Sequence, residues 1–163
     1  MNQNQFKQLF DLYFEQVRNY IFYRSGDPEL ATDIAQDTFM RIWEKQLDPE
    51  SGKEKALCYK IAGDIFVSNY RKQKTAIKFA ASAVQKNSNM ATDDQISYNE
   101  LKAKYEQALS AMNEKQRVVF LMSRNDGLKY QEIASTLNIS VKAVEKRISK
   151  ALEYLDKQLI HEQ

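Results

Sequence analysis

Hydrophobic side chains recur at three- and four-residue spacing along most of this 163-residue chain, and no stretch shows sustained alternation with a period of two. The first apolar stripe begins at Phe6, reaches Ile21 and is rich in aromatic side chains. This spacing places them on one face of an amphipathic helix. The whole chain contains only four glycines and two prolines, so we expect long helices joined by short turns. The pattern predicts an all-α protein.

Polar residues mark where the next helices begin. Asp27 stands as an N-cap before Pro28, a residue favoured at the first helical position, and this helix is expected to reach about Lys45. A third helix is expected from Lys53 to about Lys74. Its apolar residues again recur at helical spacing, so it too should bury one face in a core.

A polar segment at residues 82–95 has no periodic apolar pattern and is the best candidate for a flexible linker. Beyond it, Ser97 and Glu100 have the spacing of a capping box and predict the start of another helix. Asn113 is expected to cap the helix that follows. The predicted organisation is two small helical domains joined by a flexible linker, with the boundaries 1–78, 79–96 and 97–163.

Near the C-terminus the helical periodicity is interrupted for only three residues. A helix of about eight residues, Tyr130–Leu137, followed by a short turn and a second helix is the signature of a helix-turn-helix. Asn138 tolerates the left-handed backbone that many such turns need. Ser140 can accept a hydrogen bond from the unpaired amides at the start of the second helix.

The second helix of this motif is expected to bury one narrow apolar ridge. Val144 and Ile148 should point inward, and Leu152 and Leu155 should continue the ridge. The opposite face can then enter the major groove, where lysine and arginine neutralise phosphates or bond guanine, and glutamate accepts from cytosine. The candidate DNA-binding residues are Ser140, Lys142, Ala143, Glu145, Lys146, Arg147 and Lys150. The alternative is an ordinary helical hairpin with a solvated charged face.

The net charge of +2 conceals two basic segments. Residues 53–78 carry seven basic and two acidic side chains. Residues 115–150 carry eight basic and three acidic side chains. The segments between and around them are acidic. Two separate contacts with a polyanion such as DNA would need this arrangement, although solvated charged faces would also produce it.

The sequence lacks the motifs that indicate an enzyme, a metal centre or a membrane protein. The only histidine, His161, lies in the C-terminal tail, and neither Cys/His metal spacing nor a P-loop nor a dinucleotide-binding glycine pattern occurs. We therefore expect no catalytic activity, no metal and no cofactor. No apolar run is long enough for a membrane span, no secretory signal is evident, and the single cysteine, Cys58, suits a reducing cytoplasm.

Three segments resemble one family. The stretch EIASTLNISVKAVEKRISKAL, residues 132–152, is similar to the C-terminal DNA-binding module of bacterial sigma factors. The stretch DIAQDTFMRIWE, residues 33–44, resembles their polymerase-binding helix. The stretch ALCYKIAGDIFVSNYRKQK, residues 56–74, resembles the helix that reads the minus-ten promoter element. The order of the segments and the short linker are similar to the small extracytoplasmic-function (ECF) branch of that family.

The resemblance implies a sigma factor that binds core RNA polymerase and directs it to promoter DNA, with an anti-sigma factor as a further candidate partner. The C-terminal domain would contact the minus-thirty-five element. The implied polymerase-binding residues are Asp33, Gln36, Asp37, Arg41 and Glu44. The implied minus-ten contacts are Lys60, Asp64, Arg71, Lys72 and Lys74.

The chain departs from the family pattern at four positions, and one of them is Ser68, where the family has an aspartate. The minus-ten helix of the family usually reads Ile-Ala-Arg-Asn, whereas this chain has Gly63 and Asp64 after Ile-Ala. A carboxylate there repels phosphate, so the preference for minus-ten sequences should be altered. Lys129 stands where the family often has serine or threonine to cap the first helix of the module, which is expected to weaken that helix's start by about 1 kcal/mol.

Several interpretations stay open at this stage. Phe39 and Trp43 either belong to the core or touch polymerase. Tyr59 and Tyr70 either stack on unpaired bases or pack inside. Cys58 is interpreted as a small buried hydrophobe. The rival to a sigma factor is a helix-turn-helix transcriptional regulator that is not a polymerase subunit and binds duplex DNA by itself, as a dimer on a palindrome.

Overall fold

The computed structural model describes residues 1–49, 51–72 and 93–160, and within these ranges every regular element is an α-helix. The helices are α1 (Gln3–Ser25), α2 (Pro28–Glu44), α3 (Glu54–Lys72), α4 (Asp93–Ala111), α5 (Glu114–Arg124), α6 (Tyr130–Leu137) and α7 (Val141–Leu159). The expected all-α fold is confirmed.

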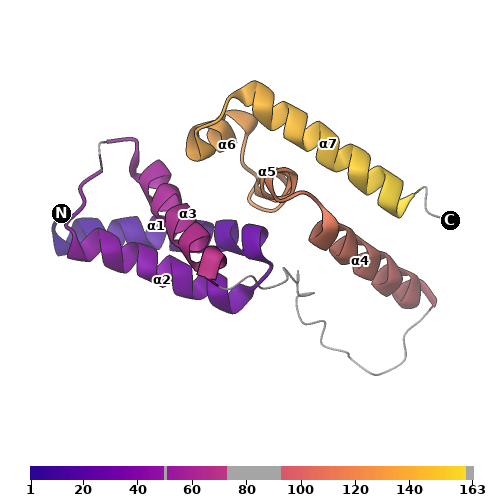
Figure 1. Cartoon of the computed structure of the whole chain (residues 1–163), viewed down its shortest axis with the longest axis horizontal. Coiled ribbons are helices and arrows are strands. Elements are labelled where there is room, and N and C mark those ends of the chain that lie inside the picture. Colours follow the sequence, from indigo (N-terminus) through magenta and orange to yellow (C-terminus); the bar gives the residue numbers. More distant parts are fainter. Residues whose placement is uncertain (50, 73–92, 161–163) are drawn as a thin grey trace.

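Helices α1, α2 and α3 form the first domain, in the lower left of Figure 1. α1 and α2 pack against each other, and α3 packs against both. Val17, Ile21 and Ile42 are fully or almost fully removed from solvent at their contact. The apolar stripes read from the sequence therefore face one another, which is how an amphipathic helix gains most of its stability.

Helices α4 to α7 form the second domain. α7 packs against α4, α5 and α6, so it forms one long side of this domain. The shorter helix α5 is apolar around much of its surface, and Val119 and Met122 are completely buried. Ile133 of α6 and Val144 of α7 meet them in the same core.

The predicted caps at helix starts are confirmed at three positions. The Asp27 side chain accepts hydrogen bonds from Glu29 N and Leu30 N at 3.0 and 3.1 Å. The Asn113 side chain accepts from Lys115 N at 3.0 Å. Each cap satisfies amides that have no partner inside the helix. Ser140 is the third cap and belongs to the turn described below.

The capping box expected at Ser97 is wrong, because α4 already begins at Asp93 and Ser97 lies inside it. The sequence places two aspartates at this earlier start, and negative charge is favourable near the N-terminus of a helix. The expected linker therefore ends several residues before position 96. The rest of the linker, residues 79–92, lies outside the described residues.

One apolar residue lies elsewhere than expected. Leu152 is 53% exposed, and Ala151 takes the inward position between Ile148 and Leu155. The buried ridge follows spacings of four, three and four residues from Val144, which leaves Leu152 beside it. Trp43 is 38% exposed and covers the ring of Phe6 at a centroid distance of 5.0 Å, whereas Phe39 is buried.

Lys129 precedes α6, and its side chain makes no capping hydrogen bond. We expect Lys129→Ser to raise the free energy of unfolding by about 1 kcal/mol, because serine can accept from an unpaired amide of the first turn. Ser140→Ala is the opposite control, since it removes a cap present in α7 and should cost about 1 kcal/mol. Urea unfolding followed by circular dichroism measures both. An unchanged midpoint for Lys129→Ser would show that the start of α6 does not limit stability.

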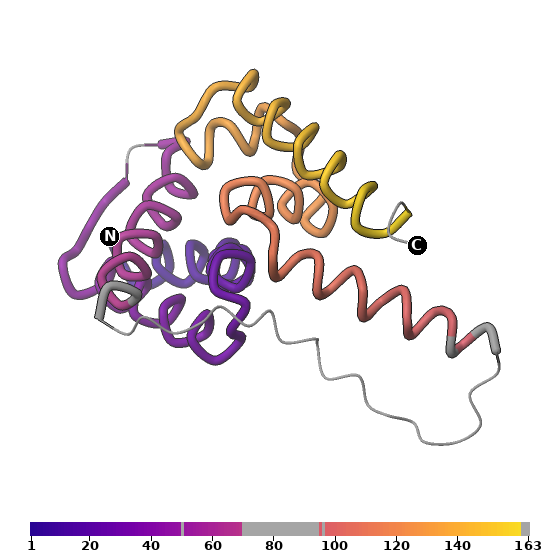
Figure 2. The backbone as a smooth tube through the Cα atoms, turned by 45° about the vertical axis from the view of Figure 1, so that its right-hand side comes forward, coloured from indigo at the N-terminus to yellow at the C-terminus, as the bar shows by residue number. Residues whose placement is uncertain are grey.

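The two domains are in contact, as both views show (Figures 1 and 2). α1 packs against α5, and α3 packs against α6. The Tyr23 hydroxyl donates to Asp126 Oδ1 at 2.7 Å, and Arg24 Nε donates to Glu114 Oε1 at 2.6 Å. The end of α1 is therefore joined by polar contacts to the first residue of α5 and to the turn that follows α5.

Candidate nucleic-acid interface

The turn between α6 and α7 has the geometry predicted for a helix-turn-helix. Asn138 adopts the left-handed conformation, with φ 55° and ψ 50°. Ile139 N donates to Ala134 O at 3.0 Å, which closes the end of α6. Ser140 Oγ accepts from Ala143 N at 3.0 Å and caps α7. The three-residue turn thus satisfies backbone groups on both of its sides.

α7 is anchored to the domain by its apolar ridge. Val144 is completely buried and Ile148 is 6% exposed, as predicted. Ala134 of α6 is 6% exposed, and its small side chain lets the two helices approach closely. The anchoring leaves the opposite side of α7 outside the core.

The structure places the predicted DNA-binding residues of this motif in two groups. Ala143 and Arg147 are half-buried, and Arg147 lines a small cavity together with Arg24 and Glu114. The others are exposed on one side of the motif: Ser140, Lys142, Glu145, Lys146 and Lys150. A helix that carries three lysines on one accessible face is suited to a phosphate-lined groove.

The exposed surface of α3 carries charges of both signs. Lys60 and Asp64 are exposed one helical turn apart, as the sequence suggested. Lys74 lies outside the described residues, and so do the side chains of Tyr70, Arg71 and Lys72. Tyr59 is 2% exposed and its hydroxyl donates to Gln16 O at 3.2 Å, so this ring packs inside the domain and is not available to stack on bases.

The polymerase-binding candidates share the outer surface of α2. All five are exposed: Asp33, Gln36, Asp37, Arg41 and Glu44. Met40 lies on the same surface and is 55% exposed, although no sequence pattern indicates a role for it. An exposed apolar side chain surrounded by charged ones is a common arrangement at protein interfaces.

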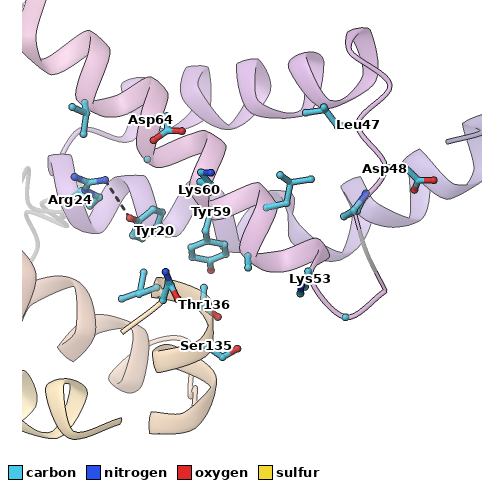
Figure 3. Close-up of a pocket in the computed structure, with 18 residues that line it drawn as sticks. Tyr20, Arg24, Leu47, Asp48, Lys53, Tyr59, Lys60, Asp64, Ser135 and Thr136 are labelled. Carbon is cyan, nitrogen blue, oxygen red and sulfur yellow. Dashed lines mark hydrogen bonds between the residues drawn. The ribbon is translucent and has the colours of Figure 1, made fainter. Parts of the chain in front are cut away.

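A cavity of about 950 Å³ lies between the two domains. Figure 3 shows Tyr20, Arg24, Tyr59 and Lys60 on the side of the first domain, with Ser135 and Thr136 of α6 opposite them. Asp48 and Lys53 lie at one end. The cavity combines basic, acidic and hydroxyl groups, and none of the second-domain residues that line it is charged.

No pattern in the sequence indicated the charged and polar residues that join the domains. Arg117 was counted only as part of a basic segment, yet it is 1% exposed and donates to Tyr23 O at 2.7 Å and to Arg24 O at 2.8 Å. Burial raises the pKa of the Asp126 carboxyl, although the hydrogen bond from Tyr23 and the charge of Lys55 offset part of this effect. These residues are distant in the sequence, so no periodic pattern reveals them.

The one cysteine of the chain, Cys58, is buried. Burial raises the pKa of the Cys58 thiol to about 12, so this thiol stays protonated, as expected of a small buried hydrophobe. His, Cys, Asp and Glu side chains in the described ranges form no group of three that could hold a metal ion. None of the described helices combines the length and apolar character needed to span a bilayer.

Comparison with known proteins agrees with this arrangement. Residues 9–76 match the family Sigma-70 region 2, and residues 102–155 match Sigma-70, region 4. The ferric citrate uptake sigma factor FecI of Escherichia coli is 30% identical over 127 residues, which cover 76% of this chain and 73% of FecI. The ECF RNA polymerase sigma factor SigW of Bacillus subtilis is 26% identical over 170 residues, which cover 97% of this chain and 90% of SigW.

A solved structure shares the fold over nearly the whole chain. It is the sigma factor RpoE from Bartonella quintana in complex with the anti-sigma factor NepR, with a TM-score of 0.65 and 22% sequence identity. The superposition covers 98% of this chain and 99% of the other.

Two helical domains, of which the second presents a basic helix-turn-helix, define a transcription protein that binds DNA. Because both sigma-70 regions match in order and FecI is related over most of its length, this chain belongs to the ECF sigma factors of bacterial RNA polymerase. It is a regulatory subunit that directs RNA polymerase in transcription initiation.

Proposed function

We propose that residues 1–78 bind core polymerase and contact the minus-ten promoter element, and that residues 97–163 contact the minus-thirty-five element. Residues 79–96 form the linker between these two domains. The observation that carries the proposal is the basic face of α7, whose lysines project from a helix anchored by Val144 and Ile148.

In the second domain α7 acts as the recognition helix. Lys142, Lys146 and Lys150 contact phosphates or guanine edges, and Glu145 is positioned to accept from cytosine. Ser140 and Ala143 lie at the N-terminal end of α7, where a recognition helix approaches base edges. Arg147 is half-buried at the border of this face and is a further proposed contact.

In the first domain α2 binds polymerase through its exposed charged residues and Met40. The mixed charges of this surface suit a protein partner better than DNA, because Asp33, Asp37 and Glu44 would repel phosphate. Trp43 is partly exposed at the edge of this surface and extends it with apolar area.

α3 contributes the minus-ten contact. Lys60 is an exposed cation on this helix, and Arg71, Lys72 and Lys74 continue the positive charge in the sequence. Asp64 disfavours a phosphate one turn from Lys60, so the preferred minus-ten sequence differs from that of relatives with Ile-Ala-Arg-Asn.

An anti-sigma factor is a further proposed partner, and the cytoplasm is the proposed location. The related fold of RpoE was solved with the anti-sigma factor NepR bound, which makes an inhibitor of this kind a reasonable partner for the present chain. The reduced state of a buried cysteine agrees with that compartment.

Capture of core RNA polymerase tests this assignment. Immobilised protein is expected to retain core enzyme, and the resulting holoenzyme is expected to start transcripts from a subset of upstream regions in a library. Arg41→Glu with Glu44→Arg should lower polymerase capture without unfolding the chain, because both side chains are exposed and the net charge is unchanged. Specific binding to palindromic duplex DNA with no polymerase capture would instead support an independent transcriptional regulator.

A further inference from the structure

α3 has no side chain at position 63, and a residue of α1 lies over the gap. A Cβ atom added to Gly63 would stand 3.3 Å from Arg24 Nη1 and 3.6 Å from the Tyr20 hydroxyl oxygen. The Arg24 guanidinium also lies over the Phe66 ring, at 4.6 Å from its centroid. Gly63 has no side chain, so α3 itself has no charge at this position. Arg24 of α1 places a positive charge there instead.

The position of Arg24 relates it to the proposed promoter contact. Arg24, Lys60 and Asp64 line the same cavity, and Figure 3 shows Arg24 and Lys60 along one wall. A hydrogen bond of 3.3 Å from Arg24 Nη1 to the Tyr20 hydroxyl helps to hold the guanidinium there. A guanidinium held by stacking and hydrogen bonding is well suited to bind an oxyanion such as a phosphate.

In this structure the oxyanion beside Arg24 is a carboxylate of the other domain. Glu114 Oε1 accepts from Arg24 Nε at 2.6 Å, and the side chains of Arg24 and Glu114 are 19% and 37% exposed. Glu114 is the first residue of α5, whereas Arg24 lies in the last turn of α1. The pair thus forms only while the two domains are together.

A residue of the recognition helix lies near the same contact. Arg147 of α7 lines a cavity of about 210 Å³ with Arg24, Glu114 and Tyr20. The hydrogen bonds from Arg117 to the end of α1 hold the domains at this place. Both proposed DNA surfaces therefore have an arginine at the contact between the domains, close to Glu114.

We propose that Arg24 is an additional nucleic-acid contact of the α3 surface, and that Glu114 occupies the phosphate position at Arg24 while the domains are closed. Glu114 then competes with DNA for this site, so the free protein binds nucleic acid less tightly than its charges allow. The proposal rests on the assignment of α3 to promoter contact, but it concerns binding by the free chain and needs no polymerase.

Glu114→Gln tests the competition, since it keeps the shape of the side chain and removes its charge. The probe is a short fluorescent single-stranded oligonucleotide of mixed sequence, titrated with the full-length protein at several salt concentrations. We expect about twofold to fivefold tighter binding, because a partly exposed ion pair contributes only about that factor. The plot of log affinity against log salt should also steepen, because one more phosphate contact forms.

Glu153→Gln is the matched control. It removes one negative charge from the second domain, where Glu153 is exposed and its partner Lys157 lies at 3.5 Å on the same helix. It should tighten binding much less than Glu114→Gln does. Circular dichroism and thermal melting establish that both variants are folded.

Arg24→Gln completes a double-mutant cycle. The gain from Glu114→Gln should disappear in the Arg24→Gln background, because the site that Glu114 blocks is then absent. An equal gain in both backgrounds, or a gain no larger than that of Glu153→Gln, would overturn the proposal. Failure of the sigma-factor assignment would appear separately, as absent polymerase capture.

Discussion

Reversal of two charges on α7, Lys142→Glu with Lys146→Glu, is expected to abolish transcription from a cognate promoter while polymerase capture survives. Each exposed lysine neutralises phosphate in the proposed complex, and each glutamate would repel it. We expect promoter affinity of the holoenzyme to fall by about a hundredfold or more. Run-off transcription and a filter-binding titration measure the two quantities.

The control for this prediction reverses two lysines away from the proposed interface. Lys104 of α4 and Lys157 at the end of α7 are both exposed, so their reversal changes the net charge by the same amount. That variant should keep most of its promoter affinity. Equal losses in the two double variants would mean that overall charge, and not the α7 face, determines binding.

Arg117→Ala is expected to have the largest effect on stability. The Arg117 guanidinium donates to four backbone carbonyls, namely Tyr23 O, Arg24 O, Leu109 O and Met112 O, at distances from 2.7 to 3.2 Å. Its loss leaves these buried acceptors without that donor and opens a cavity between α1 and α5. We expect the free energy of unfolding to fall by about 3–5 kcal/mol.

Arg124→Ala is the matched control, since Arg124 lies in the same helix but is exposed. It should change the free energy of unfolding by less than about 0.5 kcal/mol. Urea unfolding of both variants, followed by circular dichroism, measures the difference. If Arg117→Ala unfolded at the same urea concentration as Arg124→Ala, the bonds of Arg117 would contribute no net stability.

The features that the sequence predicted well are local. The caps at Asp27 and Asn113 and the turn at Asn138 depend on a residue and its nearest neighbours, so residue type and spacing are enough to find them. Burial of Val144 and Ile148 follows from periodicity in the same way. The exposure of Lys142, Lys146 and Lys150 on α7 follows from the same periodicity.

The expectations that failed depend on how neighbouring elements pack. Leu152 satisfies helical spacing from Ile148, yet Ala151 fills the inward position. Ser97 and Glu100 have the residue types and spacing of a capping box, yet α4 starts at Asp93. Several spacings satisfy a helical pattern, and the partner surface decides among them.

By itself the sequence determined the helical class of this protein, most of its helix boundaries, the helix-turn-helix and the family to which the chain is related. These follow from side-chain periodicity and backbone preferences within a few residues. Only the tertiary structure decided that Arg117 is buried, that Arg24 covers Gly63, and that Glu114 faces Arg24. The sequence does not show whether a charged side chain contacts water or another domain. The partners of Arg24 and Arg117 lie about ninety positions away in the chain, so only the tertiary structure identifies them.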